Sequence, residues 1–110
     1  MNALKNKVQL IGNLGNEPEI IDLKNGKKLA KFSLATNEYY KNQAGEKVSE
    51  TQWHNIIAWG KLAEIIENYL TKGNEIVMEG KLTSRTFKDK SGKKKWITEV
   101  VCQELVMMKK

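Results

Sequence analysis

The sequence predicts a small all-β barrel that carries a single α-helix. Apolar residues recur at a helical spacing of three and four in only one segment, residues 61–72. The other apolar segments alternate with polar residues or are rich in β-branched ones, and turn signals separate them. In chain order these segments give three strands, the helix and two further strands. A helix between strands 3 and 4 of a five-stranded Greek-key barrel is the order of the OB-fold, although other α+β folds share it.

Before the helix, three strands are expected, over residues 7–13, 28–36 and 53–59. A further short strand is expected over residues 20–23, and the hairpin signal Asn25-Gly26 closes it. Residues 39–50 are polar and contain a glycine, so we expect a mobile loop there.

From residue 61 onward we expect a helix, a strand, a hairpin tip and a last strand, over residues 61–72, 75–87, 89–95 and 96–107. Gly73 follows the helix, and Lys72 lies in its last turn, which together form a good stop signal. Gly80 lies inside the first strand after the helix and predicts a β-bulge or a bend.

The composition indicates one globular domain. Of the 110 residues, 40% are hydrophobic and 29% are charged, which argues against disorder. We expect a single domain over residues 1–110, with its core over about residues 5–107 and no tail domain after it. Cys102 is the only cysteine, so no internal disulfide can form, and its apolar neighbours predict a buried thiol in a reducing compartment. No apolar run is long enough for a secretory signal or a membrane span, so the expected location is the cytoplasm.

Basic residues are concentrated in residues 81–96. The chain has a net charge of +6, from 19 basic and 13 acidic residues. This one segment holds seven basic residues and a single acid, Asp89, so its surplus of +6 equals that of the whole chain. Such a surplus predicts an anionic partner such as nucleic-acid phosphates, while the alternative is a solvated hairpin tip that is merely basic. The expected phosphate contacts are Lys81, Arg85, Lys88, Lys90, Lys93, Lys94, Lys95 and, from a smaller cluster, Lys31.

Two tryptophans, Trp53 and Trp59, lie six residues apart in an expected strand. Because side chains alternate along a strand, both indoles project from one face. His54, Ile56 and Ala58 project from the other face, which we assign to the core. Large flat rings on the side away from the core of a basic protein are suited to stack on nucleobases, although ordinary core roles are the alternative.

Other aromatic residues extend this set. Phe87 shares a strand face with Arg85 and lies beside the basic hairpin. Tyr40 begins the polar segment and could become ordered on a nucleic acid. Tyr39 and Trp96 are equally consistent with stacking and with a structural role.

Short motifs occur along most of the chain: Asn6-Lys7-Val8, Ile11-Gly12-Asn13-Leu14-Gly15, Pro18-Glu19, Leu34-Ala35-Thr36-Asn37-Glu38, Thr51-Gln52-Trp53-His54, Gly60-Lys61-Leu62-Ala63-Glu64, Tyr69-Leu70-Thr71-Lys72-Gly73, Glu79-Gly80-Lys81-Leu82 and Thr98-Glu99-Val100-Val101. In this combination, over roughly residues 5 to 102, the chain resembles the bacterial single-stranded DNA-binding proteins (SSB). The resemblance implies an OB-fold that binds and protects single-stranded DNA in replication, recombination and repair. It also implies a bacterial cytoplasmic location at the nucleoid and no cofactor.

The resemblance further implies roles for single residues. Trp53 falls on a base-stacking tryptophan, and Trp59, Phe87 and Tyr40 fall on positions where the family has stacking aromatics. His54 falls near subunit contacts, and the family usually assembles as homotetramers, as dimers of dimers. Many members carry a long tail with an acidic end that recruits other proteins. This chain ends in basic residues, so we do not expect recruitment through a tail.

Two other binding functions stay open. An OB-fold assembly or adaptor protein of the replication machinery would place Trp53 and Trp59 in a protein interface. A single-stranded RNA binder is the other option, because stacking does not detect a 2′-hydroxyl. Enzymes are not expected, since one histidine and one cysteine cannot form a structural zinc site, the HExxH and P-loop spacings are absent, and the acids are scattered.

Overall fold

The computed structural model describes residues 5–108; Met1–Leu4, where no secretory signal is expected, and the basic end Lys109-Lys110 lie outside the described residues. Its elements are β1 (Val8–Leu14), β2 (Glu19–Asp22), β3 (Lys28–Lys41), β4 (Lys47–Trp59), α1 (Lys61–Tyr69), β5 (Glu75–Lys88) and β6 (Lys94–Met107). No helix within residues 5–108 is long and apolar enough to cross a membrane.

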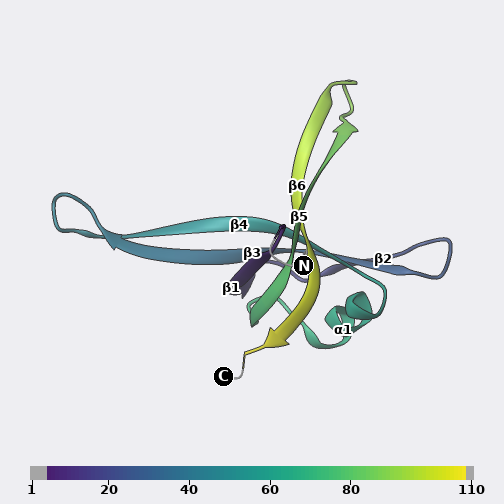
Figure 1. The fold of residues 1–110 in the computed structure, drawn as a ribbon, viewed down its shortest axis with the longest axis horizontal. Coiled ribbons are helices and arrows are strands. Elements are labelled where there is room, and N and C mark those ends of the chain that lie inside the picture. Colours follow the sequence, from purple (N-terminus) through teal and green to yellow (C-terminus); the bar gives the residue numbers. More distant parts are fainter. Residues whose placement is uncertain (1–4, 109–110) are drawn as a thin grey trace.

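The strands form one sheet that closes into a barrel (Figure 1). They follow the order β1-β5-β6-β4-β3-β2, and the ring closes where Asn13 and Leu14 of β1 pair with Ala35 and Leu34 of β3. Strands β4 and β6 pair in parallel, while the other pairs are antiparallel. Because β2 pairs with β3 outside this ring, α1 lies between the third and fourth of five barrel strands. The predicted OB-fold is confirmed.

The hydrophobic core fills the barrel and the space under α1. Leu34 of β3, Ile56 of β4, and Ile76 and Met78 of β5 are 0–1% exposed, and Ile66 of α1 is fully buried against them. Burying such a side chain contributes about 1.5–3 kcal/mol. Since one face of each strand supplies this core, the opposite face is left for other roles.

The helix ends at Tyr69, three residues before the predicted end. Leu70 is extended, with φ −101° and ψ 138°, yet it is only 3% exposed and its N–H still donates to the carbonyl four residues back. The N–H of Thr71 donates to Oδ1 of Asn74 at 2.8 Å, so a side chain replaces the next helical acceptor. The apolar spacing continues to Leu70 because that residue is buried, but the backbone has already left the helix.

The prediction of a mobile loop at residues 39–50 is wrong. Strands β3 and β4 pair continuously to Lys41 opposite Lys47, and only residues 42–46 form the turn. The side-chain oxygen of Asn42 accepts the N–H groups of two turn residues, at 3.0 and 2.9 Å. Most side chains on both faces of this ribbon are exposed, so no apolar alternation marks it in the sequence.

Long ribbons project from the barrel (Figure 1). We call the paired ends of β3 and β4 the β3–β4 arm, and those of β5 and β6 the β5–β6 arm. The radius of gyration is 16.1 Å, compared with about 13 Å for a compact chain of this length. At the base of the β5–β6 arm the register shifts between Glu79 and Gly80, which confirms the predicted bulge. The pairing then continues to Lys88 opposite Lys94, so β6 begins two residues before the predicted start.

The single cysteine is expected to resist alkylation in the native protein. Cys102 lies in the core, and burial raises the pKa of its thiol to about 11. At pH 8 only about 0.1% of such a thiol is ionised, and the thiolate is the reactive form. Mass spectrometry should therefore find little carbamidomethylation after iodoacetamide at pH 8, and full modification in guanidinium chloride. Rapid labelling of the native protein would contradict the buried position.

Candidate nucleic-acid interface

Trp53 and Trp59 project from the outer surface of β4. Their side chains are 63% and 47% exposed, whereas the intervening Ile56 and Ala58 are 1% and 0% exposed. The alternation predicted from the sequence is therefore confirmed. Ile57 shares the outward face but is only 9% exposed, so it forms a floor between the two indoles.

The ring of Trp53 packs on the connection between β1 and β2. A Cβ built on Gly15 would lie 2.3 Å from Cζ3 of Trp53, so the indole contacts this backbone directly. Asn16 fixes the connection, because its Oδ1 accepts hydrogen bonds from the N–H of Ser33 at 2.9 Å and from its hydroxyl at 3.1 Å. The contact between Gly15 and Trp53 has no sequence signal, because the two residues are far apart in the chain.

Two hollows lie on the outer face of the barrel, and Trp59 lines one of them. One, bordered by Asn55, has a volume of about 220 Å³, and the other, bordered by Trp59, has a volume of about 440 Å³. Both hollows are lined by Lys31, Ile57, Arg85 and Glu99. These four residues come from β3, β4, β5 and β6, so the hollows form one groove across the strands. We refer to this pair of hollows as the groove.

The β5–β6 arm carries an aromatic residue on each face. Phe87 is 40% exposed, lies opposite Lys95, and shares its face with Arg85 as predicted. Trp96 is 73% exposed and lies opposite Thr86, on the other face of the arm. Phe87 is thus on the face that carries the groove, and Trp96 is not.

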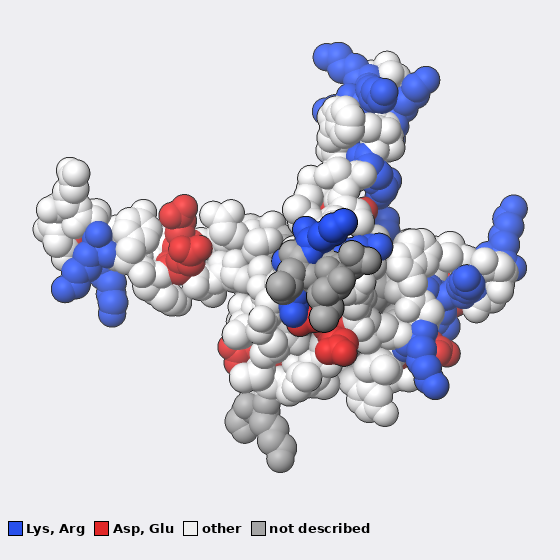
Figure 2. All heavy atoms as spheres, viewed as in Figure 1, with Lys and Arg blue, Asp and Glu red and all other residues white. Residues whose placement is uncertain are grey.

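The β3–β4 arm carries two exposed tyrosines on opposite faces. The register of β3 against β4 places Tyr39 on the outward face with Trp53. Tyr40 falls on the other face, which also carries Glu38 and Glu50 directly opposite each other. Figure 2 shows acidic side chains on this arm. The structure therefore does not bring Tyr40 onto the face of Trp53, and Tyr39 occupies that place instead.

Basic side chains gather at the end of the β5–β6 arm, as Figure 2 shows. Within the described part of the chain, six of the eight expected phosphate contacts form no ion pair: Lys31, Lys81, Lys88, Lys90, Lys93 and Lys94. The Nζ of Lys95 lies 3.8 Å from Oδ2 of Asp89. Asp89 also accepts hydrogen bonds from the hydroxyl and N–H of Ser91 and from the N–H of Lys93, and these bonds lower its pKa. Asp89 thereby gives the lysine-rich tip a fixed shape.

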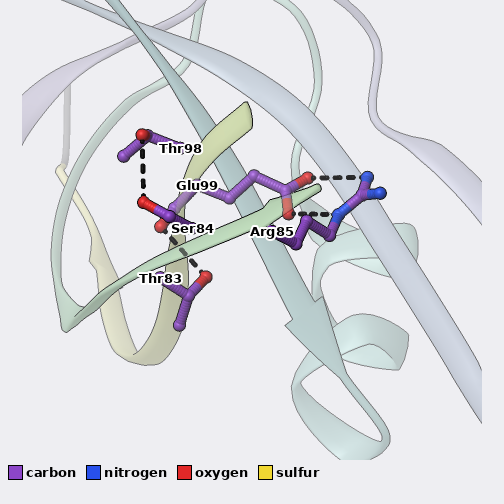
Figure 3. Close-up of polar contacts among 5 residues, drawn as sticks. All are labelled: Thr83, Ser84, Arg85, Thr98 and Glu99. Atoms are coloured by element: carbon purple, nitrogen blue, oxygen red, sulfur yellow. Dashed lines mark hydrogen bonds and ion pairs between the residues drawn. The ribbon is translucent and has the colours of Figure 1, made fainter. Parts of the chain in front are cut away.

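Arg85 forms an ion pair with Glu99, which was not predicted from the sequence. Its Nε donates to Oε1 of Glu99 at 3.0 Å, and its second contact reaches Oε2 at 3.5 Å (Figure 3). This hydrogen bond, with the charge of Glu99, raises the pKa of Arg85. The two residues are diagonal neighbours across β5 and β6, since Thr83 lies opposite Glu99. Their pairing depends on the strand register, so scanning the acids along the sequence could not find it.

His54 lies on the other side of β4, half-buried, with Nε2 2.9 Å from Oγ1 of Thr36. It borders a hollow of about 470 Å³ that is also lined by Ile11 of β1. Beside this hollow, β1 pairs with β3 only at its last two residues, so one edge of residues 8–12 has no strand partner within the described chain. No group of three or more His, Cys, Asp or Glu residues that could hold a metal occurs within residues 5–108.

Comparison with known proteins gives a consistent result. The model of the single-strand binding protein family matches residues 5–108. Single-stranded DNA-binding protein 1 of Chlorobaculum tepidum is 46% identical over 104 residues, which cover 94% of this chain and 64% of the relative. Single-stranded DNA-binding protein 1 of Xylella fastidiosa is 42% identical over 109 residues, which cover 98% of this chain and 80% of the relative. The chain thus spans a little under two thirds of the Chlorobaculum relative.

Solved structures agree with the sequence matches. The structure described as a Plasmodium falciparum SSB complex with ssDNA has a TM-score of 0.86 and 35% identity, covering 94% of this chain and 95% of that one. A deletion mutant of the single-stranded DNA binding protein from Thermus aquaticus has a TM-score of 0.82 and 25% identity, covering 94% of this chain and 50% of that one. With the barrel, the exposed tryptophans and the basic arm, these matches show that the chain belongs to the single-strand binding protein family.

Proposed function

We propose that this chain binds single-stranded DNA with little sequence preference. The observation that carries the proposal is the pair Trp53 and Trp59, 63% and 47% exposed on the outer face of the barrel. Every base has a flat face, so stacking on indoles tolerates any sequence and contributes about 1–3 kcal/mol per base. The family membership supports the same function, as does the likeness to the Plasmodium falciparum SSB complex with ssDNA.

Bases and phosphates would contact different parts of the surface. Trp53, Trp59 and Phe87 present their rings on the groove side and would stack on bases. Tyr40 would be reached only by a strand that passes around the β3–β4 arm, whereas Tyr39 lies on the direct path. The lysines without acidic partners would hold phosphates, each with a log–log salt slope of about −0.7.

Such binding would protect single-stranded DNA during replication, recombination and repair, in the cytoplasm beside the nucleoid. We infer a single OB-fold domain over residues 1–110, with its core over about residues 5–107, that catalyses no reaction. A stacking groove on an all-β barrel supports this inference, since it needs no reacting group or cofactor to hold DNA.

We further propose that the chain assembles as a homotetramer, a dimer of dimers. The free edge of β1 could pair with the same edge of a second copy, since an exposed edge offers unpaired N–H and C=O groups. Ile11 and Val106 are 54% and 64% exposed and offer apolar area outside the groove. His54 borders the hollow beside this edge, which is consistent with a role near subunit contacts.

The binding proposal can be tested with fluorescein-labelled oligonucleotides and anisotropy. We expect tight, salt-dependent binding of dT oligomers and weak binding of duplex DNA of the same length. Equal affinity for duplex would contradict the stacking role. Tighter binding of the matching RNA would favour the RNA alternative, and no binding of any strand would favour the adaptor function.

The assembly can be tested by native mass spectrometry of the free protein. A mass of four chains is expected, and Ile11→Lys should shift it toward smaller species because a charge would enter the apolar contact. A monomer at all concentrations would contradict the proposed assembly without affecting the binding test.

Lys90→Ala is expected to reduce the salt dependence of single-stranded DNA binding and to leave the stacking of bases largely unchanged. Lys90 lies at the arm tip and forms no ion pair in the described chain, so its loss should remove one phosphate contact. The log–log slope for a dT oligomer should become shallower by about 0.7. An unchanged slope would show that the tip does not contact the DNA.

A further inference from the structure

A buried acid lies in the middle of the proposed DNA path. Glu99 is 5% exposed and is the only buried charged residue within residues 5–108. Arg85, whose side chain is 52% exposed, covers its carboxylate from the solvent side. The hydroxyl of Thr83 donates to the backbone carbonyl of Glu99 at 3.3 Å, and Ser84 and Thr98 share a hydrogen bond at 3.2 Å (Figure 3). These contacts fix β5 and β6 around the acid.

The larger hollow of the groove combines an apolar wall with this ion pair. The apolar wall consists of Leu29, Ile57, Trp59 and Val101. A phosphate entering the hollow would lose its hydration against apolar side chains and would find the charge of Arg85 already balanced by the carboxylate of Glu99. An uncharged base would meet the indole of Trp59 and the balanced charges of Arg85 and Glu99. Lys31 also lines this hollow and forms no ion pair in the described chain, so it stays available to a phosphate next to the stacked base.

The arginine explains why the acid is needed. An unpaired guanidinium on the groove wall would bind phosphate strongly, because its fork matches the phosphate oxygens. In this structure the Nε–H of Arg85 is used by Glu99, and the charge is balanced. A basic residue in the most basic segment of the chain is thereby withheld from the phosphates.

We infer that Glu99 is a specificity-determining residue that withholds Arg85 from phosphates, so that the wall of the hollow beside Trp59 favours a base. Arg85 acts as its positioning residue and balances its charge. The inference rests on the proposed binding of single-stranded DNA. It places a base over Trp59 and the phosphates on the lysines without acidic partners.

The test measures the affinity for two labelled oligonucleotides of equal length over a series of salt concentrations. One is a dT oligomer, and the other has the same sugar–phosphate backbone without bases. The wild-type protein should bind dT far more tightly than the abasic strand. In E99Q the charge of the guanidinium is no longer balanced, so the abasic strand should gain severalfold in affinity at low salt, and the log–log slope should steepen by about 0.7. In the double variant R85Q/E99Q both charges are gone, and the wild-type slope should return.

Glu104→Gln is the matched control, because it removes the same charge from an exposed position on the same strand, outside the groove. An equal shift in this control would show a general charge effect and overturn the role of Glu99. An unchanged slope in E99Q would also overturn the role of Glu99. A slope in R85Q/E99Q that is shallower than wild type by about 0.7 would overturn it too, because Arg85 would then contact phosphate in the native protein. If E99Q does not fold, the double variant decides. Failure of the wild-type protein to bind dT would instead overturn the proposed function.

Discussion

Trp53→Ala is expected to weaken the binding of single-stranded DNA by about 1–3 kcal/mol, which is roughly 5- to 150-fold in Kd. The indole is 63% exposed and rests on the backbone of Gly15, so its orientation is set before DNA arrives. A ring held in place loses little freedom on binding, and its full stacking energy is available to the base. Anisotropy titration with a labelled dT oligomer measures the change without relying on tryptophan fluorescence.

Trp96→Ala is the matched control for this experiment. Trp96 is even more exposed, at 73%, but it lies on the face of the β5–β6 arm that is turned away from the groove. We expect its loss to change Kd by less than about threefold, within the usual range for a surface substitution. Equal losses in both variants would mean that exposed aromatic area alone matters, and that the groove does not define the DNA path.

The outward position of Trp53 and Trp59 could be predicted from the sequence because core residues occupy the alternate positions of the same strand. Ile56 and Ala58 are apolar at the alternate positions, so strand alternation assigns the two faces without any knowledge of partners. The bulge at Gly80 was predicted for a similar reason, since a glycine inside a strand has a local meaning. Both features depend on near neighbours in the chain.

Features that depend on strand register could not be predicted in this way. The pairing of Arg85 with Glu99 requires knowing which residues of β5 and β6 lie opposite each other. The choice of Tyr39 over Tyr40 for the face of Trp53 requires the β3–β4 arm, which the sequence presents as a polar loop. A ribbon with solvent on both sides has no apolar face to mark it, so its length appears only in the folded chain.

Gly80→Ala is expected to lower the free energy of unfolding by about 3 kcal/mol, at the upper end of the range for overpacking. A Cβ at this position would lie 2.0 Å from the carbonyl oxygen of Val101 and 3.1 Å from Cα of Cys102. Both are backbone atoms, so no flexible side chain can move aside, and the paired strands themselves must shift. Urea unfolding at one fixed protein concentration measures the loss and keeps any contribution of assembly constant.

Gly92→Ala separates this steric effect from the general cost of replacing glycine. Gly92 has φ 86° at the tip of the β5–β6 arm, and a Cβ there would meet nothing within 4 Å. Its replacement costs only backbone strain, about 1 kcal/mol, and that strain can be relieved by local fraying of the tip. A larger loss at Gly92 than at Gly80 would contradict the close approach of β5 and β6. Because the bulge sets the register that joins Arg85 to Glu99, Gly80→Ala should also change the salt dependence of DNA binding in molecules that remain folded, whereas Gly92→Ala should not.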